Sequence, residues 1–365
     1  MTASNENGPP SQRQSQEQAQ RQSRGNGAQS QSQSQSQGRR MPIPAIVRPN
    51  RAMLSRTADN LFWLARYVER ADYLARTIEA TQRLSALPAA YGGSTNEWEG
   101  LLITAGCDEP FFEAHQTAAA EEVIDFLAFS PDNPSSIRNC FEIARTNARS
   151  VRTALTSEMW EAINGAWLEL NRSRGRRLRG EELSRFLGWV KEASLRFDGS
   201  AYRTMLRSDS YWFLRLGVFV ERADNTARIL DVKYHLLLPE NERIGGGLDY
   251  YQWTAILRAV SAVTSYHWVY RESLKPWLIA DLLILNDQMP RSLAACYSAI
   301  VRDLDEIART YGLHGPAQRL ARAIRSNLEN TTVEGIFASG LHEFVTDFIE
   351  ENTELGSAIT RQYLI

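Results

Sequence analysis

The fold is decided by LSRTADNLFWLARYVERADYLARTIEA, residues 54–80, and by its second copy LRSDSYWFLRLGVFVERADNTARILDV, residues 206–232. Both contain Val-Glu-Arg-Ala-Asp, at Val68–Asp72 and Val220–Asp224, and in both an Ala-Arg pair begins three residues later. The glutamates are 152 residues apart, which is too long for the period of a solenoid. We therefore expect two related long helices in a pseudo-two-fold arrangement, each central to its own half of one multi-helix bundle.

Apolar residues recur in each copy at intervals of three or four, which is the pattern of an α-helix with one apolar face. The alanines in this pattern allow a second helix to approach closely, at the short end of the interaxial range of roughly 8–10 Å. The two faces are Leu61, Leu64, Val68, Ala71, Ala75 and Ile78 in the first copy, and Phe213, Leu216, Val220, Ala223, Ala227 and Leu230 in the second.

Charged residues follow one flank of each face. Asp72 and Arg76 form an i,i+4 pair in the favourable acid-first order, and Asp224 and Arg228 repeat it. Each arginine that directly follows a motif glutamate points away from that glutamate around the helix, so it needs a partner on another element or in water. These two arginines are Arg70 and Arg222.

If the two helices pack together, eight charged side chains could converge, and three interpretations are open. They could form an ion-pair network that fixes helix register, a functional polar pocket, or a carboxylate metal site. Di-iron bundles use Glu-x-x-His, whereas Asp stands at that position in both copies, so we assign no metal. The candidate residues are Glu69, Arg70, Asp72, Arg76, Glu221, Arg222, Asp224 and Arg228.

The first fifty residues have a different composition from the rest of the chain. The first forty of them are rich in Gln and Ser and nearly free of apolar side chains, and residues 1–50 are predicted to be a disordered tail. No apolar segment of the secretory type follows the arginines of this region. Residues 51–365 are predicted to form a single α-helical domain. Translation could start at Met1, Met41 or Met53.

Composition narrows the class of protein. The formal charge of −2 and the pI near 6.3 provide no overall attraction to nucleic acid or to an anionic membrane. No run of about 18 apolar residues is present, so no membrane span is predicted. Three widely spaced cysteines without a Cys-x-x-Cys motif favour a reducing cytoplasm and disfavour zinc. The sequence therefore predicts a cytoplasmic protein without a cofactor.

Helical periodicity continues beyond the two motif helices, and no alternating strand pattern of useful length interrupts it. The predicted class is all-α. Besides the motif helices, which should end near residues 87 and 238, the predicted helices are 96–105, 109–115, 117–128, 137–155, 157–170, 181–202, 250–266, 275–285, 290–311, 316–328 and 332–360.

Three further groups of residues are candidate sites. Arg291 and Ser292 stand near a predicted helix start, where free backbone N–H groups could bind an anion, or they could simply cap the helix. Five arginines between residues 171 and 180 form either a solvated loop or a contact for phosphate or an acidic partner. The aromatic residues around His267 are either core or a docking face. The last two groups are Arg172, Arg174, Arg176, Arg177 and Arg179, and Tyr266, Trp268, Tyr270 and Trp277.

Four separated segments together resemble the bacterial alpha-E family, which is named for an all-α domain with a Glu-Arg motif. They are MLSRTADNLFWLARYVERAD (53–72), ARTNARSVRTALTSEMWEAIN (144–164), LRLGVFVERAD (214–224) and LILNDQMPRSLAAC (283–296). The resemblance covers the chain from about Met53 onward. Members of that family are typically encoded beside, or fused to, ATP-grasp ligase-like and transglutaminase-like proteins. The resemblance therefore implies a role in making or modifying peptide or amide bonds.

Two functions from different classes follow. The first is a non-catalytic accessory or scaffold protein that binds an ATP-grasp ligase-like partner, with a transglutaminase-like protein as a second candidate partner. The alternative is a helical transferase or hydrolase that acts on an amide-containing substrate through a Glu/Asp/Arg pocket. The sequence has no P-loop, no Gly-x-Ser-x-Gly and no dinucleotide fingerprint, so it assigns no catalytic residue.

Overall fold

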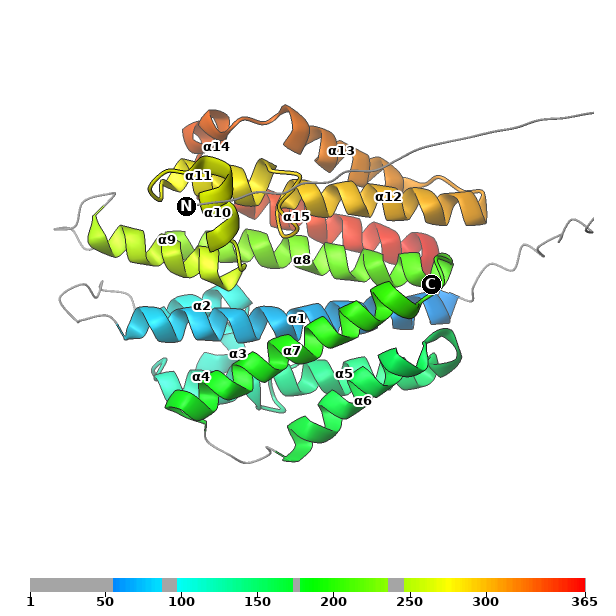
Figure 1. Ribbon diagram of the computed structural model, residues 1–365, viewed down its shortest axis with the longest axis horizontal. Coiled ribbons are helices and arrows are strands. Elements are labelled where there is room, and N and C mark those ends of the chain that lie inside the picture. Colours follow the sequence, from blue (N-terminus) through cyan, green and yellow to red (C-terminus); the bar gives the residue numbers. More distant parts are fainter. Residues whose placement is uncertain (1–54, 87–96, 173–177, 236–245, 365) are drawn as a thin grey trace, which may run out of the picture. The chain divides into compact units, whose positions relative to one another are not determined.

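A computed structural model describes residues 55–86, 97–172, 178–235 and 246–364. All of them belong to one compact unit, Pro49–Ile365. Within these ranges the chain forms helices and turns and no strand, which confirms the all-α class (Figure 1). The predicted tail of residues 1–50 lies outside the described residues, as do Arg174, Arg176 and Arg177.

Two long helices that carry the repeated motif form the centre of this unit. They are α1 (Ser55–Ser85) and α8 (Asp209–His235), and they pack directly against each other (Figure 1). Gly217 marks their closest approach. A Cβ atom at this position would lie 2.2 Å from the carbonyl oxygen of Phe62 and 3.2 Å from the Cβ of Ala65. Only glycine fits there, because the backbone of α1 occupies the space that any side chain would need.

The remaining long helices surround the central pair in two matching sets. On α1 lie α5 (Ile137–Ser150) and α7 (Gly180–Thr204), and α6 (Ser157–Arg172) packs against both. On α8 lie α12 (Leu293–Tyr311) and α15 (Leu341–Ile359), and α13 (Pro316–Asn330) packs against both. This correspondence is what a duplication would produce, while the approximate two-fold axis itself stays a prediction.

Shorter helices link the two sets reciprocally. The helix α2 (Glu97–Ala105) contacts α8, and α9 (Gly247–Ala259) contacts α1. Both end in a left-handed residue, Gly106 with φ +63° and Ser261 with φ +58°. In each case the next amide N–H bonds back to a carbonyl five residues earlier, a geometry that satisfies the last carbonyls of a helix. The other short elements are α3 (Asp108–Phe112), α4 (Ala120–Ala128), α10 (Val263–Tyr270) and α11 (Pro276–Ala280).

Several predicted helices were wrong in their limits. The predicted helix 332–360 is broken at Gly340, where φ is +100°, into α14 (Val333–Ser339) and α15. The predicted helix 250–266 is broken at Ser261 into α9 and α10. The helix predicted from residue 290 begins at Leu293, because the Ser292 hydroxyl caps it. Three segments that follow α-helices are helical turns of another type. Arg152–Ala154 is a 3₁₀ turn, and Asp281–Leu285 and Thr360–Leu364 (η4) are π-helical turns.

Within the described ranges, no helix is both long enough and apolar enough to cross a membrane.

Candidate functional site

The repeated motif forms two crossed ion pairs between the central helices. Arg222 donates two hydrogen bonds of 2.9 Å to the carboxylate of Glu69. Arg70 donates in return to Glu221, through Nε at 2.6 Å and Nη2 at 3.2 Å. Successive residues of a helix point about 100° apart, so each glutamate meets the arginine of the other copy and not its own neighbour. The two crossed ion pairs therefore join α1 to α8 at the repeated motif.

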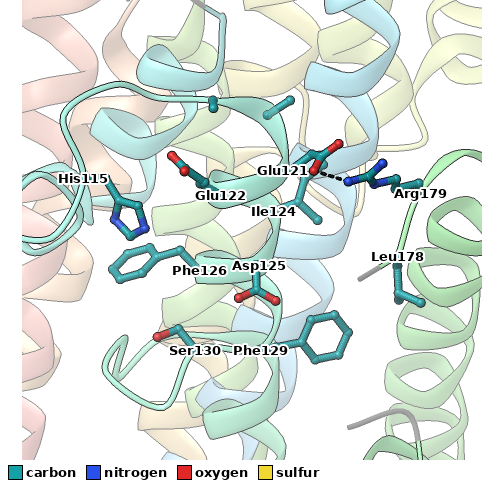
Figure 2. Close-up of a pocket in the computed structure, with 12 residues that line it drawn as sticks. His115, Glu121, Glu122, Ile124, Asp125, Phe126, Phe129, Ser130, Leu178 and Arg179 are labelled. Carbon is teal, nitrogen blue, oxygen red and sulfur yellow. Dashed lines mark hydrogen bonds and ion pairs between the residues drawn. The ribbon is translucent and has the colours of Figure 1, made fainter. Parts of the chain in front are cut away.

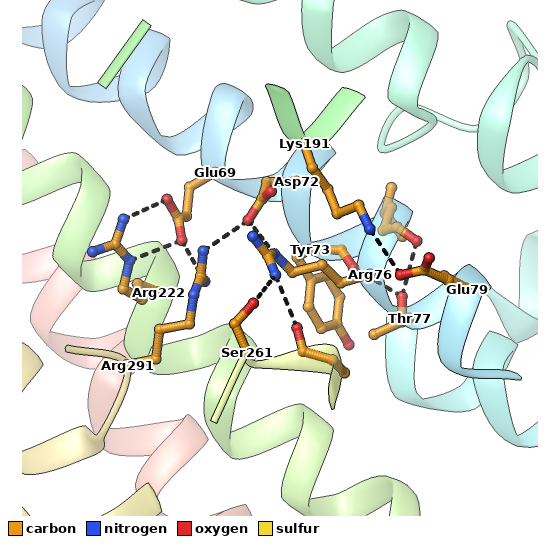
Figure 3. Close-up of polar contacts among 12 residues, drawn as sticks. Glu69, Asp72, Tyr73, Arg76, Thr77, Glu79, Lys191, Arg222, Ser261 and Arg291 are labelled. Carbon is orange, nitrogen blue, oxygen red and sulfur yellow. Dashed lines mark hydrogen bonds and ion pairs between the residues drawn. The ribbon is translucent and has the colours of Figure 1, made fainter. Parts of the chain in front are cut away.

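A third guanidinium extends the first of these pairs. Arg291 donates from Nη1 to Glu69 at 2.9 Å and from Nη2 to Asp72 at 2.8 Å (Figure 3). Ser292 is fully buried, accepts the N–H of Ala295 and donates to a carbonyl of the preceding turn. Of the two interpretations of Arg291 and Ser292, the geometry favours the helix cap, because both side chains are engaged within the protein.

The aspartates of the motif bind a second pair of arginines, and these arginines contact the ends of the short helices α9 and α2. Arg76 binds Asp72 at 2.7 Å and reaches the carbonyl of Ala259 and the hydroxyl of Ser261, at the end of α9 (Figure 3). In the other copy Arg228 binds Asp224 at 2.7 Å and reaches the carbonyl oxygen of Thr104 at 3.4 Å, near the end of α2. A cation at a helix C-terminus is favourable because carbonyl oxygens are unpaired there. Each motif thus fastens the short helix of the opposite half.

Burial and charge determine the ionisation of the two glutamates. Glu69 and Glu221 are both buried. Burial alone would raise the pKa of Glu69, but the guanidinium groups of Arg222 and Arg291 outweigh it and lower the pKa to about 2. At Glu221 burial would again raise the pKa, but the guanidinium groups of Arg66 and Arg70 outweigh it and lower the pKa to about 2. Both carboxylates are ionised at neutral pH.

The geometry favours the ion-pair network among the three interpretations of the motif. Each glutamate binds two arginines, so neither presents a free carboxylate to a substrate. The described residues contain no group of three or more His, Cys, Asp or Glu side chains able to hold a metal ion. Sequence reasoning missed Arg66, whose Nε donates to Glu221 at 2.6 Å, and the role of Arg291. The available signal for Arg66 was its place one helical turn before Glu69, on the flank that the motif charges occupy.

A separate cavity of about 570 Å³ lies beside α4 (Figure 2). Its wall combines three carboxylates, Glu121, Glu122 and Asp125, with His115. The imidazole of His115 stacks on Phe111 with ring centroids 4.2 Å apart, and its Nδ1 lies 3.0 Å from the carbonyl oxygen of the same residue. Arg179, the last arginine of the basic segment, pairs with Glu121 at the edge of this cavity. Arg172 pairs with Glu169 on α6. The sequence analysis did not single out the acidic residues of this wall.

The aromatic residues around His267 divide into core and surface. Tyr266 is fully buried and donates from its hydroxyl to the carbonyl of Ser273, so of the two interpretations the structure places it in the core. Tyr270 is half-buried and hydrogen-bonds to Asp281. Trp268 and Trp277 are exposed, with 74% and 49% of their surface accessible. Only these two tryptophans remain candidates for contact with a partner.

Comparisons with known proteins agree with this arrangement. Residues 53–364 match the model of the Alpha-E family, described as a predicted alpha-helical domain with a conserved ER motif. An uncharacterized protein of Mycobacterium bovis is 22% identical over 330 residues, which cover 80% of this chain and 36% of that protein. Uncharacterized proteins from two strains of Mycobacterium tuberculosis are 22% and 21% identical over the same shares. This chain thus spans about a third of the length of these relatives. No solved structure matches it.

Proposed function

Because the chain belongs to the Alpha-E family, we propose that it is a non-catalytic accessory or scaffold protein of a cytoplasmic system that forms peptide or amide bonds. Its partner in this proposal is an ATP-grasp ligase-like protein, and a transglutaminase-like protein is a second possible partner. The observation that carries the proposal is the exposed tryptophan pair on neighbouring elements, Trp268 on α10 and Trp277 on α11.

The surroundings of the two tryptophans suit a protein contact. Val269, next to Trp268, is half exposed, and Phe337 of α14 is also exposed, on a helix that contacts α11. The ammonium group of Lys275 lies 5.5 Å from the ring of Trp277, a cation–π contact that leaves the ring accessible. Tryptophan is enriched among the residues that contribute most to binding at protein interfaces. We call Trp268, Val269, Trp277 and Phe337 the aromatic surface.

The state of the motif carboxylates supports the non-catalytic part of the proposal. A general acid or base works best with a pKa near the operating pH. The pKa values of Glu69 and Glu221 are lowered to about 2, and both side chains are held by arginines from two directions. The enzyme alternative, which relied on these residues as a reactive pocket, has no specific observation in its favour.

The lengths of the relatives support a function together with other protein sequence, and the state of the cysteines supports a cytoplasmic location. In the mycobacterial relatives the matched region is 36% of a longer chain, so it operates together with further protein sequence there. Cys107, Cys140 and Cys296 are buried free thiols, which suits a reducing compartment.

The test is a binding assay with the full chain as bait and a purified ATP-grasp ligase-like protein as prey. The variant Trp268→Ala/Trp277→Ala should reduce retention at least tenfold at an unchanged melting temperature. Leu206→Ala is the matched control, because Leu206 is 80% exposed and belongs to the turn between α7 and α8. Full retention by the tryptophan variant would reject the aromatic surface. ATP turnover or amide hydrolysis by the purified chain alone would reject the non-catalytic proposal.

A further inference from the structure

At one pair of corresponding positions, only one half of the molecule carries a charged side chain. Before α5 the chain reads Pro134-Ser135-Ser136, and before α12 it reads Pro290-Arg291-Ser292. Ser136 and Ser292 have the same role, since each hydroxyl accepts the N–H three residues later and caps its helix. Four residues after each cap stands a fully buried cysteine. Ser135 is therefore the counterpart of Arg291.

This difference leaves the second motif aspartate with fewer charged partners than the first. Asp72 binds both Arg76 and Arg291, and only 2% of its side chain is exposed. Asp224 receives a charged hydrogen bond only from Arg228 among the residues that the structure describes, and 15% of its side chain is exposed. Ser135 is too short to take the place that Arg291 occupies in the other half. Asp224 therefore has one cationic partner fewer than Asp72, and more of its side chain is exposed.

A cavity of about 410 Å³ opens at Asp224. Arg66 and Trp63 of α1 form one wall, and the end of α15 with η4 forms another, including Ser357, Thr360 and Arg361. Arg66 is held in place by Glu221 and lies 4.7 Å from the ring of Trp63, so this wall is fixed. The volume is within the range of roughly 300–1,000 Å³ that is usual for small-molecule sites.

The opposite wall of this cavity carries an available positive charge. Within the described part of the chain, Arg361 has no ion pair or hydrogen bond from its guanidinium group, and it lines the cavity together with the hydroxyl of Ser357. A guanidinium group binds carboxylates through two parallel hydrogen bonds. The cavity therefore offers an acceptor for a cation at Asp224 and a donor for an anion at Arg361.

We propose that this cavity binds a free amino acid or a dipeptide, with its ammonium group at Asp224 and its carboxylate at Arg361. The ammonium group would be a second cationic partner of Asp224 beside Arg228, just as Arg291 is a second partner of Asp72 beside Arg76. A purely anionic ligand would lie against the Asp224 carboxylate, and a purely cationic ligand would face Arg66 and Arg361. A zwitterion satisfies both groups. This proposal does not depend on the scaffold function or on its partner.

Isothermal titration of the full chain with alanyl-alanine tests the proposal. The N-acetylated dipeptide lacks the ammonium group, and the dipeptide amide lacks the carboxylate. We expect the free dipeptide to bind, and each blocked form to bind about 10- to 100-fold more weakly, since each loses one charge-assisted contact. No binding of the free dipeptide at 10 mM (an order-of-magnitude limit for small ligands) would overturn the proposal. Equal binding of all three forms would overturn it too.

Two substitutions locate the contacts. Asp224→Asn should remove the difference between the free and the acetylated dipeptide, and Arg361→Gln should remove the difference between the free dipeptide and its amide. Arg361 is an exposed residue of the final turn, so its variant should fold even if Asp224→Asn disturbs Arg228. Arg325→Gln, on α13, is the control and should bind like the unaltered protein. Retention of both differences in both variants would place the ligand elsewhere and overturn the proposal.

Discussion

Glu69 and Arg70 are neighbours in the chain, yet they bind two different residues of α8: Glu69 accepts from Arg222, and Arg70 donates to Glu221. A donor and an acceptor on each helix are needed for this exchange, which explains why the motif couples Glu directly to Arg. A single charged residue per helix could make at most one of the two pairs. The adjacent Glu and Arg therefore allow two copies of the motif to bind each other through two ion pairs.

Loss of either glutamate should destabilise the protein strongly. Glu69→Ala and Glu221→Ala each leave partly buried guanidinium groups without their carboxylate, and we expect each to lower the free energy of unfolding by about 3–5 kcal/mol. Denaturant titration measures this change. Glu329→Ala, which removes an exposed partner of Arg325, is the control and should cost about 1 kcal/mol or less. Wild-type stability of both motif variants would mean that the network contributes nothing to the fold.

Acid should destabilise the protein through the same two carboxylates. Their pKa is near 2 in the folded protein, below the ordinary value of 4.5, so their contribution is complete above about pH 5 and is lost as the pH falls from 4.5 to 2. The loss should be on the order of 3 kcal/mol for each carboxylate. Denaturant titrations between pH 6 and pH 3 measure the first part of this loss, and a Glu69→Gln/Glu221→Gln variant should show a flatter dependence. An equally steep dependence in that variant would assign the effect to other groups.

Asp303 should act on stability in the opposite direction. It is fully buried, and burial raises its pKa to about 6 although Arg302 opposes the shift. A carboxyl whose folded pKa lies above its ordinary value of 3.8 stabilises the fold as the pH falls through 6 toward 3.8. We expect Asp303→Asn to be more stable than the wild type at pH 8 by about 1–3 kcal/mol, with a smaller difference at pH 5. A destabilised variant at pH 8 would show that the ionised carboxylate is needed there.

Gly217 should tolerate no side chain. Alanine is a better helix former than glycine by about 1 kcal/mol, but at this position its Cβ would overlap the Phe62 carbonyl oxygen and push α1 from α8. We expect Gly217→Ala to lower the melting temperature, at a cost of about 1–3 kcal/mol or more. Gly188→Ala on α7 is the matched control, because no atom lies within 4 Å of its Cβ, and it should be neutral or stabilising. A stable Gly217→Ala protein would contradict the close approach of the two helices.

Sequence patterns were enough for the helical class, the two motif helices and the need of Arg70 and Arg222 for distant partners, because all three follow from the helical period. They were not enough for the bonds of Arg291, since the reach of a long side chain across a helix pair depends on how the helices pack. The break at Ser261 was missed because a left-handed serine has no compositional signal. The sequence left Tyr266 undecided between core and surface, because an aromatic cluster has the same pattern in both.

The pairing of the two halves also bears on how such a chain could diverge. If one half existed alone, two separate molecules could exchange the same Glu–Arg bonds as a homodimer, and positions 135 and 291 would then be the same residue by necessity. Once both halves lie in one polypeptide, each gene segment can mutate independently. Arginine at one position and serine at the other is a difference that no symmetric ancestor could carry. Two halves in one polypeptide can therefore enclose one motif aspartate between two arginines and leave the other with a single arginine.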